Sequence, residues 1–157
     1  MSKWYKYMVS WFSQGSDFKP RNKSLYKKWL TEIVRHKGQK LKDLAVIACS
    51  DSYMLELNRR FLGHDYYTDV ITFDARLPLH WPLHISAGIE GDIFISIDRV
   101  KANAILYDVS FNEEFARVLV HGLLHLLGYK DSTPAEQEQM CIEEDAALCL
   151  FHQYVHL

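Results

Sequence analysis

The chain reads SFNEEFARVLVHGLLHLLGYKD over residues 110–131, and this stretch contains the signals for one long helix. Ser110, followed three residues later by Glu113, forms a capping box, which satisfies free amides at a helix N-terminus. Gly128 follows an apolar run and supplies the left-handed residue that commonly ends a helix. The stretch therefore predicts a central helix from Ser110 to about Leu127.

The rest of the chain alternates between helical and strand patterns. Apolar residues spaced three and four apart predict helices, and short apolar runs predict buried strands. The predicted helices are 22–36, 51–61, 98–106 and 134–151, and the predicted strands are 44–49, 70–73 and 93–97. Residues 75–90 contain Pro78, Pro82 and Gly88, which predicts a loop or an exposed edge segment. Few strands mixed with several helices indicate an α+β or mixed α/β fold.

Composition limits the class of protein. A length of 157 residues favours a single domain over 1–157. No apolar run approaches the roughly 18 residues that a membrane span requires, and the N-terminus lacks the features of a signal peptide. The three cysteines have no CxxC spacing, which is typical of a reduced cytosolic protein with thiols that act as small core hydrophobes. We therefore expect a cytoplasmic protein without a membrane segment.

Charge is distributed unevenly along the chain. Residues 1–42 carry 11 of the 18 Lys and Arg side chains, although the formal net charge of the whole chain is −2. Such asymmetry is a hint of an anionic partner, for example a nucleic acid. On charge alone, a solvated basic helix face is the simpler explanation.

Two histidines of the central helix suggest a metal site. His121 and His125 lie four residues apart, which puts both imidazoles on one helix face. Asp131 follows the turn and is placed to act as a third ligand. A zinc ion held by two histidines and a carboxylate keeps an open position for water, and the metal makes that water a nucleophile near neutral pH. The alternative is that both histidines are ordinary helix residues and Asp131 only stabilises the turn.

Gly122 argues against a zinc peptidase. Peptidases with an HExxH pattern have a glutamate directly after the first histidine, where it acts as the general base. Gly122 has no side chain for that role and instead suits close packing on a strand or close approach of a substrate.

Three blocks of the sequence together resemble the YbeY-type endoribonucleases, also described as ribosomal-RNA maturation factors. The blocks are LNRRFLGHDYYTDVITF at 57–73, GDIFIS at 91–96 and HGLLHLLGYKD at 121–131. The resemblance implies a small mixed sheet of about four strands covered by about five helices, with the metal site at the end of the central helix. It also implies metal-dependent cleavage of single-stranded RNA in ribosomal RNA maturation, with the small ribosomal subunit as a partner. Zinc would be held by His121, His125 and Asp131.

The chain departs from the commonest pattern of this family at two positions. The usual third ligand is a histidine, and here it is Asp131, whose harder oxygen also suits Mg²⁺ or Mn²⁺. The family usually carries an arginine, thought to contact the RNA, at the position of Leu62. These departures motivate an alternative function: a non-catalytic RNA-binding factor of ribosome assembly with a degenerate or structural metal site.

Arg59, His64 and Lys130 are the candidate substrate-binding residues. Arg59, or alternatively Arg60, could lie near Leu62, one turn earlier on the helix. His64 precedes the strand at 70–73, where it could act as an acid, a base or a phosphate contact. Lys130 could neutralise charge that develops on the phosphate. The plainer interpretations are an exposed loop histidine and a lysine that complements the helix dipole. Asp92 is interpreted as a turn residue or as a partner that orients a histidine.

Overall fold

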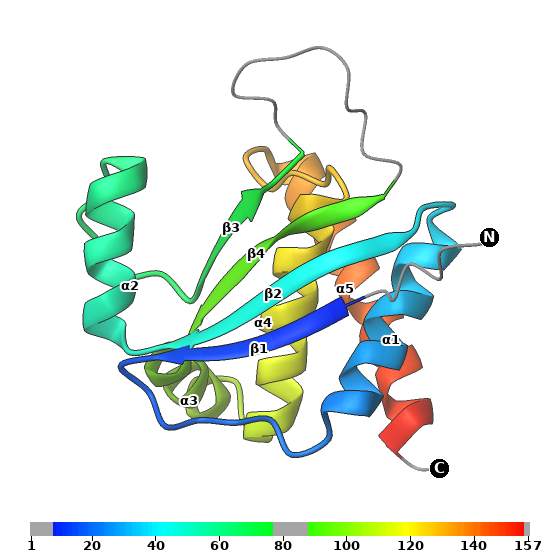
Figure 1. The fold of residues 1–157 in the computed structure, drawn as a ribbon, viewed down its shortest axis with the longest axis horizontal. Coiled ribbons are helices and arrows are strands. Elements are labelled where there is room, and N and C mark those ends of the chain that lie inside the picture. Colours follow the sequence, from blue (N-terminus) through cyan, green and yellow to red (C-terminus); the bar gives the residue numbers. More distant parts are fainter. Residues whose placement is uncertain (1–7, 77–87, 156–157) are drawn as a thin grey trace, which may run out of the picture.

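The computed structural model describes residues 8–76 and 88–155. These residues form a four-stranded sheet, five α-helices and a short π-helical segment (Figure 1). The strands are β1 (Met8–Gln14), β2 (Leu41–Cys49), β3 (Val70–Asp74) and β4 (Ile89–Ser96). The helices are α1 (Lys23–His36), α2 (Asp51–Leu57), α3 (Ile97–Leu106), α4 (Phe111–Leu126) and α5 (Pro134–Val155), and the π-helical segment η1 covers Asn58–Leu62. The expected α+β fold is confirmed.

The sheet is mixed and ends in an antiparallel edge strand. Its strand order is β1-β2-β4-β3, with β1, β2 and β4 parallel and β3 antiparallel to β4. Successive residues of a strand face opposite sides of a sheet. Val70 and Thr72 therefore face one side of β3, while Ile71 and Phe73 face the other.

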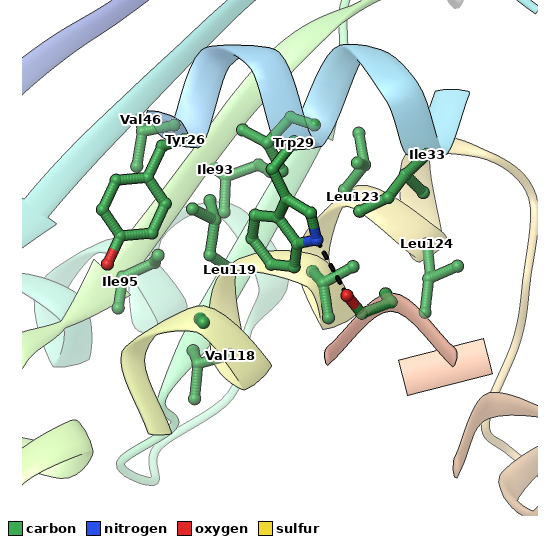
Figure 2. Close-up of a cluster of buried hydrophobic side chains, with 14 of the residues drawn as sticks. Tyr26, Trp29, Ile33, Val46, Ile93, Ile95, Val118, Leu119, Leu123 and Leu124 are labelled. Atoms are coloured by element: carbon green, nitrogen blue, oxygen red, sulfur yellow. Dashed lines mark hydrogen bonds between the residues drawn. The ribbon is translucent and has the colours of Figure 1, made fainter. Parts of the chain in front are cut away.

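One face of the sheet, here called the α4 face, carries the main core. α4 packs on it, with α1 and α5 alongside (Figure 1). Figure 2 shows side chains of α1 and α4 meeting those of the sheet, among them Trp29, Leu119 and Ile93. The Trp29 indole is fully buried and donates to the Ala147 carbonyl at 2.8 Å. Because burying a large apolar side chain contributes about 1.5–3 kcal/mol, this packing holds α4 firmly against the sheet.

The opposite face, here called the α2 face, is covered less completely. A second hydrophobic cluster lies between α2 and the sheet, and its buried members are Ile47, Cys49, Met54, Leu57 and Ile71. Away from that cluster, Phe12 of β1 is 55% exposed and Asp43 of β2 is exposed as well. Among the helices of residues 8–76 and 88–155, none is long and apolar enough to cross a membrane.

Several element boundaries differ from the sequence-based expectation. The helix predicted over 51–61 leaves α-helical geometry after Leu57 and continues as η1. β4 begins at Ile89, so the prediction of a loop is wrong for the last two residues of 75–90, while 77–87 lie outside the described residues. β2 begins at Leu41 and α5 continues to Val155, because pairing and packing extend both elements beyond their apolar cores.

β1 is absent from the strands that the sequence pattern predicts. Its serines at positions 10 and 13 interrupt the apolar run, which hides the strand from a search for short hydrophobic segments. Parallel pairing with β2 supplies the partners for its backbone amides. This strand is therefore specified by its neighbour as much as by its own residues.

The cysteines correct one expectation. Cys49 is buried in β2, and burial raises the pKa of its thiol to about 12. Cys141 and Cys149 are exposed on α5. The interpretation of the thiols as core hydrophobes is therefore right for Cys49 and wrong for the other two.

Candidate metal centre

The central helix begins and ends where the sequence indicates. The Ser110 hydroxyl accepts a hydrogen bond from the Glu113 amide at 3.1 Å, and Gly128 has a φ of +98° just beyond the helix. His121 and His125 lie in the last two turns of α4, both half-buried. The left-handed turn at Gly128 brings the chain back so that Asp131 lies beside them.

Three ligand atoms converge at the end of α4. The Nε2 atoms of His121 and His125 are 2.9 Å apart, and Asp131 Oδ2 lies 3.4 Å from the first and 3.5 Å from the second. All three potential ligand atoms lie within 4.8 Å of one another. The structure therefore brings together the three residues that the sequence predicts as metal ligands.

The other ring nitrogens determine what this cluster can bind. Nδ1 of His125 lies 3.0 Å from the Tyr129 carbonyl oxygen, and Nδ1 of His121 lies 2.5 Å from Glu144 Oε1. A carbonyl and a carboxylate only accept, so each Nδ1 carries the hydrogen and each neutral ring keeps a lone pair on Nε2. Two lone pairs and a carboxylate oxygen then face one another at close range. A cation among them resolves that repulsion, and the donor set fits a zinc-like metal.

Glu144 contacts the ligand cluster through His121, and sequence reasoning missed it. It is 6% exposed on α5, and Arg117 of α4 lies 3.5 Å from its Oε2. Arg117 also donates to both carboxylate oxygens of Glu114, at 2.6 and 2.8 Å. Burial opposes protonation of His121, but the hydrogen bond and the negative charge of Glu144 outweigh it and raise the pKa of His121. The sequence contained one sign of this contact. Glu144 lies on the apolar stripe of the predicted last helix, where a charged side chain requires a partner.

Gly122 explains how closely α4 approaches the sheet. A Cβ at this position would lie 2.8 Å from Ile93 Cγ2, 3.1 Å from Val70 Cγ2 and 3.2 Å from Thr72 Cγ2. The close packing on a strand that the sequence suggests is confirmed. This contact keeps the two histidines next to β3.

A cavity of about 370 Å³ adjoins the ligand cluster, and we call it the metal-site pocket. It is lined by Asn58, Leu62, His64, Tyr66, Thr68, Val70, Ile71, Thr72, His125 and Asp131. The Tyr66 hydroxyl lies 2.9 Å from His64 Nδ1, and the two rings stack with centroids 5.1 Å apart. His64 is therefore in the same pocket as two of the three candidate ligands.

The other candidate residues lie outside the lining of this pocket. Arg59 is exposed and pairs with Asp65 at 2.5 Å, and Lys130 is exposed next to Asp131. Asp92 lies inside β4, opposite Phe73, on the α2 face. It is therefore not a turn residue, and no histidine of residues 8–76 and 88–155 is its partner, so within the described residues neither interpretation of Asp92 holds.

The comparisons with known proteins show the family of the chain. The family model described as Endoribonuclease YbeY matches residues 12–152. The chain belongs to the endoribonuclease YbeY family. A relative named Endoribonuclease YbeY from Cytophaga hutchinsonii is 46% identical over 90% of this chain and 94% of its own length. A second relative with the same name, from Flavobacterium psychrophilum, is 40% identical over 92% of this chain and 97% of its own length.

A solved structure supports the fold of this YbeY family member. The solution structure of a Thermotoga maritima protein superimposes with a TM-score of 0.59 at 27% sequence identity, covering 92% of this chain and 89% of that one. The three sequence blocks that resemble the family converge in the fold. Residues 57–73 and 121–131 supply the whole lining of the metal-site pocket, and 91–96 lie in β4, which pairs with β3 and packs against α4 at Gly122.

Proposed function

We propose that this protein is a metal-dependent, single-strand-specific endoribonuclease that acts in ribosomal RNA maturation. Its whole chain, 1–157, would act as one domain in the cytoplasm, with the small ribosomal subunit as a partner. The observation that carries this proposal is the meeting of two histidine Nε2 lone pairs and the Asp131 oxygen beside an open pocket.

Zinc is the metal that we propose for His121, His125 and Asp131. Two imidazoles and one carboxylate are a ligand set used by catalytic zinc sites. When bound, zinc lowers the pKa of a water molecule and polarises a phosphoryl oxygen. Because Asp131 supplies a hard oxygen, Mg²⁺ or Mn²⁺ is the alternative metal.

The protein side chains orient the ligands and the substrate. Glu144 and the Tyr129 carbonyl hold the two imidazoles in the tautomer that leaves Nε2 free. When the Tyr66 hydroxyl donates to His64 Nδ1, His64 Nε2 carries a hydrogen that it can donate to a phosphate or to the leaving oxygen. Arg59 and Lys130 are proposed as contacts to the RNA backbone outside the pocket, where exposed cations attract phosphates.

RNA cleavage by the purified protein tests the proposal. A labelled single-stranded RNA should be cut, a matched duplex should be cut far less, and a chelator should stop the reaction until zinc is restored. His121→Ala should be inactive, whereas His152→Ala, which changes an exposed histidine of α5, should behave like the wild type. Unchanged cleavage by His121→Ala would refute the proposal.

Metal content tests the third ligand separately. Gently purified wild-type protein should contain one zinc per chain, and Asp131→Ala should contain much less. Asp65→Ala removes an exposed carboxylate that lies outside the ligand cluster and serves as the control. Equal metal content in wild type and Asp131→Ala would show that another residue completes the site.

The alternative is a non-catalytic RNA-binding factor of ribosome assembly. Leu62 favours it, because an apolar side chain lines the metal-site pocket where a nuclease needs groups that contact phosphate. RNA binding that weakens with salt in the usual way, without turnover in zinc, magnesium or manganese, would support this alternative over the nuclease.

A further inference from the structure

A second cavity, of about 400 Å³, lies on the α2 face of the sheet. We call it the aromatic pocket, and its lining residues are Tyr53, Glu56, Leu57, Arg60, Phe61, Phe73, Asp92 and Phe94. It lies across β3 and η1 from the metal-site pocket, since neighbouring residues of both elements line one pocket or the other. Its volume is within the roughly 300–1,000 Å³ that is typical of sites for small organic ligands.

Aromatic rings dominate the lining of this pocket. Phe73 contacts Phe61 and Phe94 edge to face, with ring centroids 5.8 and 5.7 Å apart. Phe61 is 57% exposed, so much of its ring is not covered by protein. Exposed aromatic rings are the platforms on which proteins stack unpaired bases.

Asp92 is the unusual polar group of the pocket. Its carboxylate has no hydrogen-bond or ion-pair partner among the residues that the structure describes. Burial, and then the nearby Asp43, raise the pKa of Asp92, whose half-buried carboxylate remains open to the pocket. A partly buried carboxylate without a partner favours a ligand that offers hydrogen-bond donors.

We propose that the aromatic pocket binds a guanine base, which stacks on the rings and donates N1–H and N2–H to the Asp92 carboxylate. Among the four RNA bases, only guanine presents two adjacent donors on its Watson–Crick edge, which matches the two acceptors of a carboxylate. Adenine and cytosine place an acceptor beside their donor, and uracil flanks its donor with acceptors. The pocket therefore distinguishes guanine from the other bases.

The charged side chains beside Asp92 suit the rest of a nucleotide. The Arg60 guanidinium lies 5.4 Å from the centre of the Phe61 ring and can reach a phosphate. Glu56, one helical turn earlier, can accept a hydrogen bond from a ribose hydroxyl. Arg60 also disfavours a protein arginine as the occupant, because two guanidinium groups would repel each other.

Binding of mononucleotides to the full-length protein tests this proposal without RNA cleavage. Calorimetry should show that GMP binds at least about fivefold more tightly than AMP, which is the lower end of what one bidentate base contact contributes. Asp92→Asn should abolish the preference for GMP. Asp43→Asn is the control, because it removes a negative charge from the neighbouring strand β2, outside the pocket. This variant should keep the preference for GMP.

A second variant separates stacking from base recognition. Phe61→Ala changes an exposed ring, and it should weaken GMP and AMP alike by about tenfold, because stacking of one base contributes roughly 1–3 kcal/mol. Equal binding of GMP and AMP by the wild type, or a preference that survives in Asp92→Asn, would overturn the proposal. An arginine-containing peptide that binds where GMP does not would overturn it in favour of a protein partner.

An experiment with RNA distinguishes a guanine within the RNA substrate from a free guanine nucleotide. This experiment rests on the proposed nuclease function. Oligouridines with one guanine at successive positions should show a lower KM when guanine lies at one fixed distance from the cut, with kcat unchanged, and Asp92→Asn should remove this effect. If GMP binds but no guanine position affects KM, the pocket serves a free guanine nucleotide. If GMP binds and no RNA is cleaved, the nuclease function fails while the guanine pocket stands.

Discussion

The two sides of β3 carry pockets of opposite design. On the α4 face, the Nδ1 atoms of His121 and His125 each have a fixed partner, and their Nε2 atoms meet at 2.9 Å. On the α2 face, aromatic rings surround Asp92, a carboxylate without a partner among the described residues. The first arrangement holds ligand atoms at the short distances that a metal requires, whereas the second tolerates a flat, neutral ligand. One edge strand can thus serve two kinds of chemistry, because alternate side chains point in opposite directions.

The largest effect that we predict is the loss of a ligand on the α4 face. His121→Ala should lower zinc affinity and RNA cleavage by more than about 100-fold, which exceeds the usual cost of losing an outer partner of a ligand. Guanine binding on the α2 face should be unchanged, as measured by calorimetry with GMP. If the loss of His121 also abolished GMP binding, the two pockets would not be independent.

Removing the hydrogen-bond partner of His121 should have the next largest effect. Glu144→Gln leaves the shape of the side chain but weakens its hold on the His121 ring, so zinc affinity should fall by about 10–100-fold. Glu143→Gln is the matched control, since Glu143 pairs with Lys37 and Tyr129 instead. A competition titration with a zinc chelator measures the zinc affinity of both variants. Equal zinc affinities of Glu144→Gln and Glu143→Gln would show that Glu144 does not support the metal site.

Filling the contact between α4 and β3 should affect stability and the metal-site pocket together. In Gly122→Ala the new methyl group would crowd Ile93 and Val70. Overpacking of this kind costs about 1–3 kcal/mol, which exceeds the gain of about 1 kcal/mol in helix propensity. Thermal unfolding should therefore show a lower Tm. A higher Tm would mean that the sheet yields easily and that helix propensity dominates.

The smallest effect concerns Asp92 and the pH dependence of stability. The pKa of Asp92 is raised in the folded protein, chiefly by burial and then by Asp43. Ionisation of Asp92 above that raised pKa therefore destabilises the folded state relative to the unfolded state. Asp92→Asn should raise the Tm at pH 7 by roughly one to three degrees. This advantage should shrink as the pH falls through the raised pKa towards the unfolded value, and a constant advantage at every pH would contradict the explanation.

The sequence was a good guide where a local pattern has one structural solution. The capping box at Ser110, the stop at Gly128 and the four-residue spacing of the histidines led directly to α4 and to two convergent imidazoles. The position of Asp131 followed from the turn that Gly128 imposes. Membership of the endoribonuclease family, inferred from three blocks, is confirmed, while the roles of Arg59, His64 and Lys130 stay predictions.

The sequence was a poor guide where the outcome depends on distant partners. β1 has no strong apolar run and exists as a strand because β2 pairs with it. Asp92, which precedes the predicted strand at 93–97, was interpreted as a turn residue or a partner of a histidine, yet pairing on both sides places it inside β4. Both errors have one cause, since a strand depends on neighbours that are remote along the chain.

The sequence by itself determined the helix that carries the histidines, the metal ligands it would offer, and the family. Hydrogen bonds within a helix and side chains one turn apart are local, so a short stretch of residues specifies them. Only the tertiary structure decided that Glu144, 23 residues after His121, fixes the imidazole, and that β3 separates two pockets. Those features arise from packing between distant segments, and no local pattern encodes which surfaces meet.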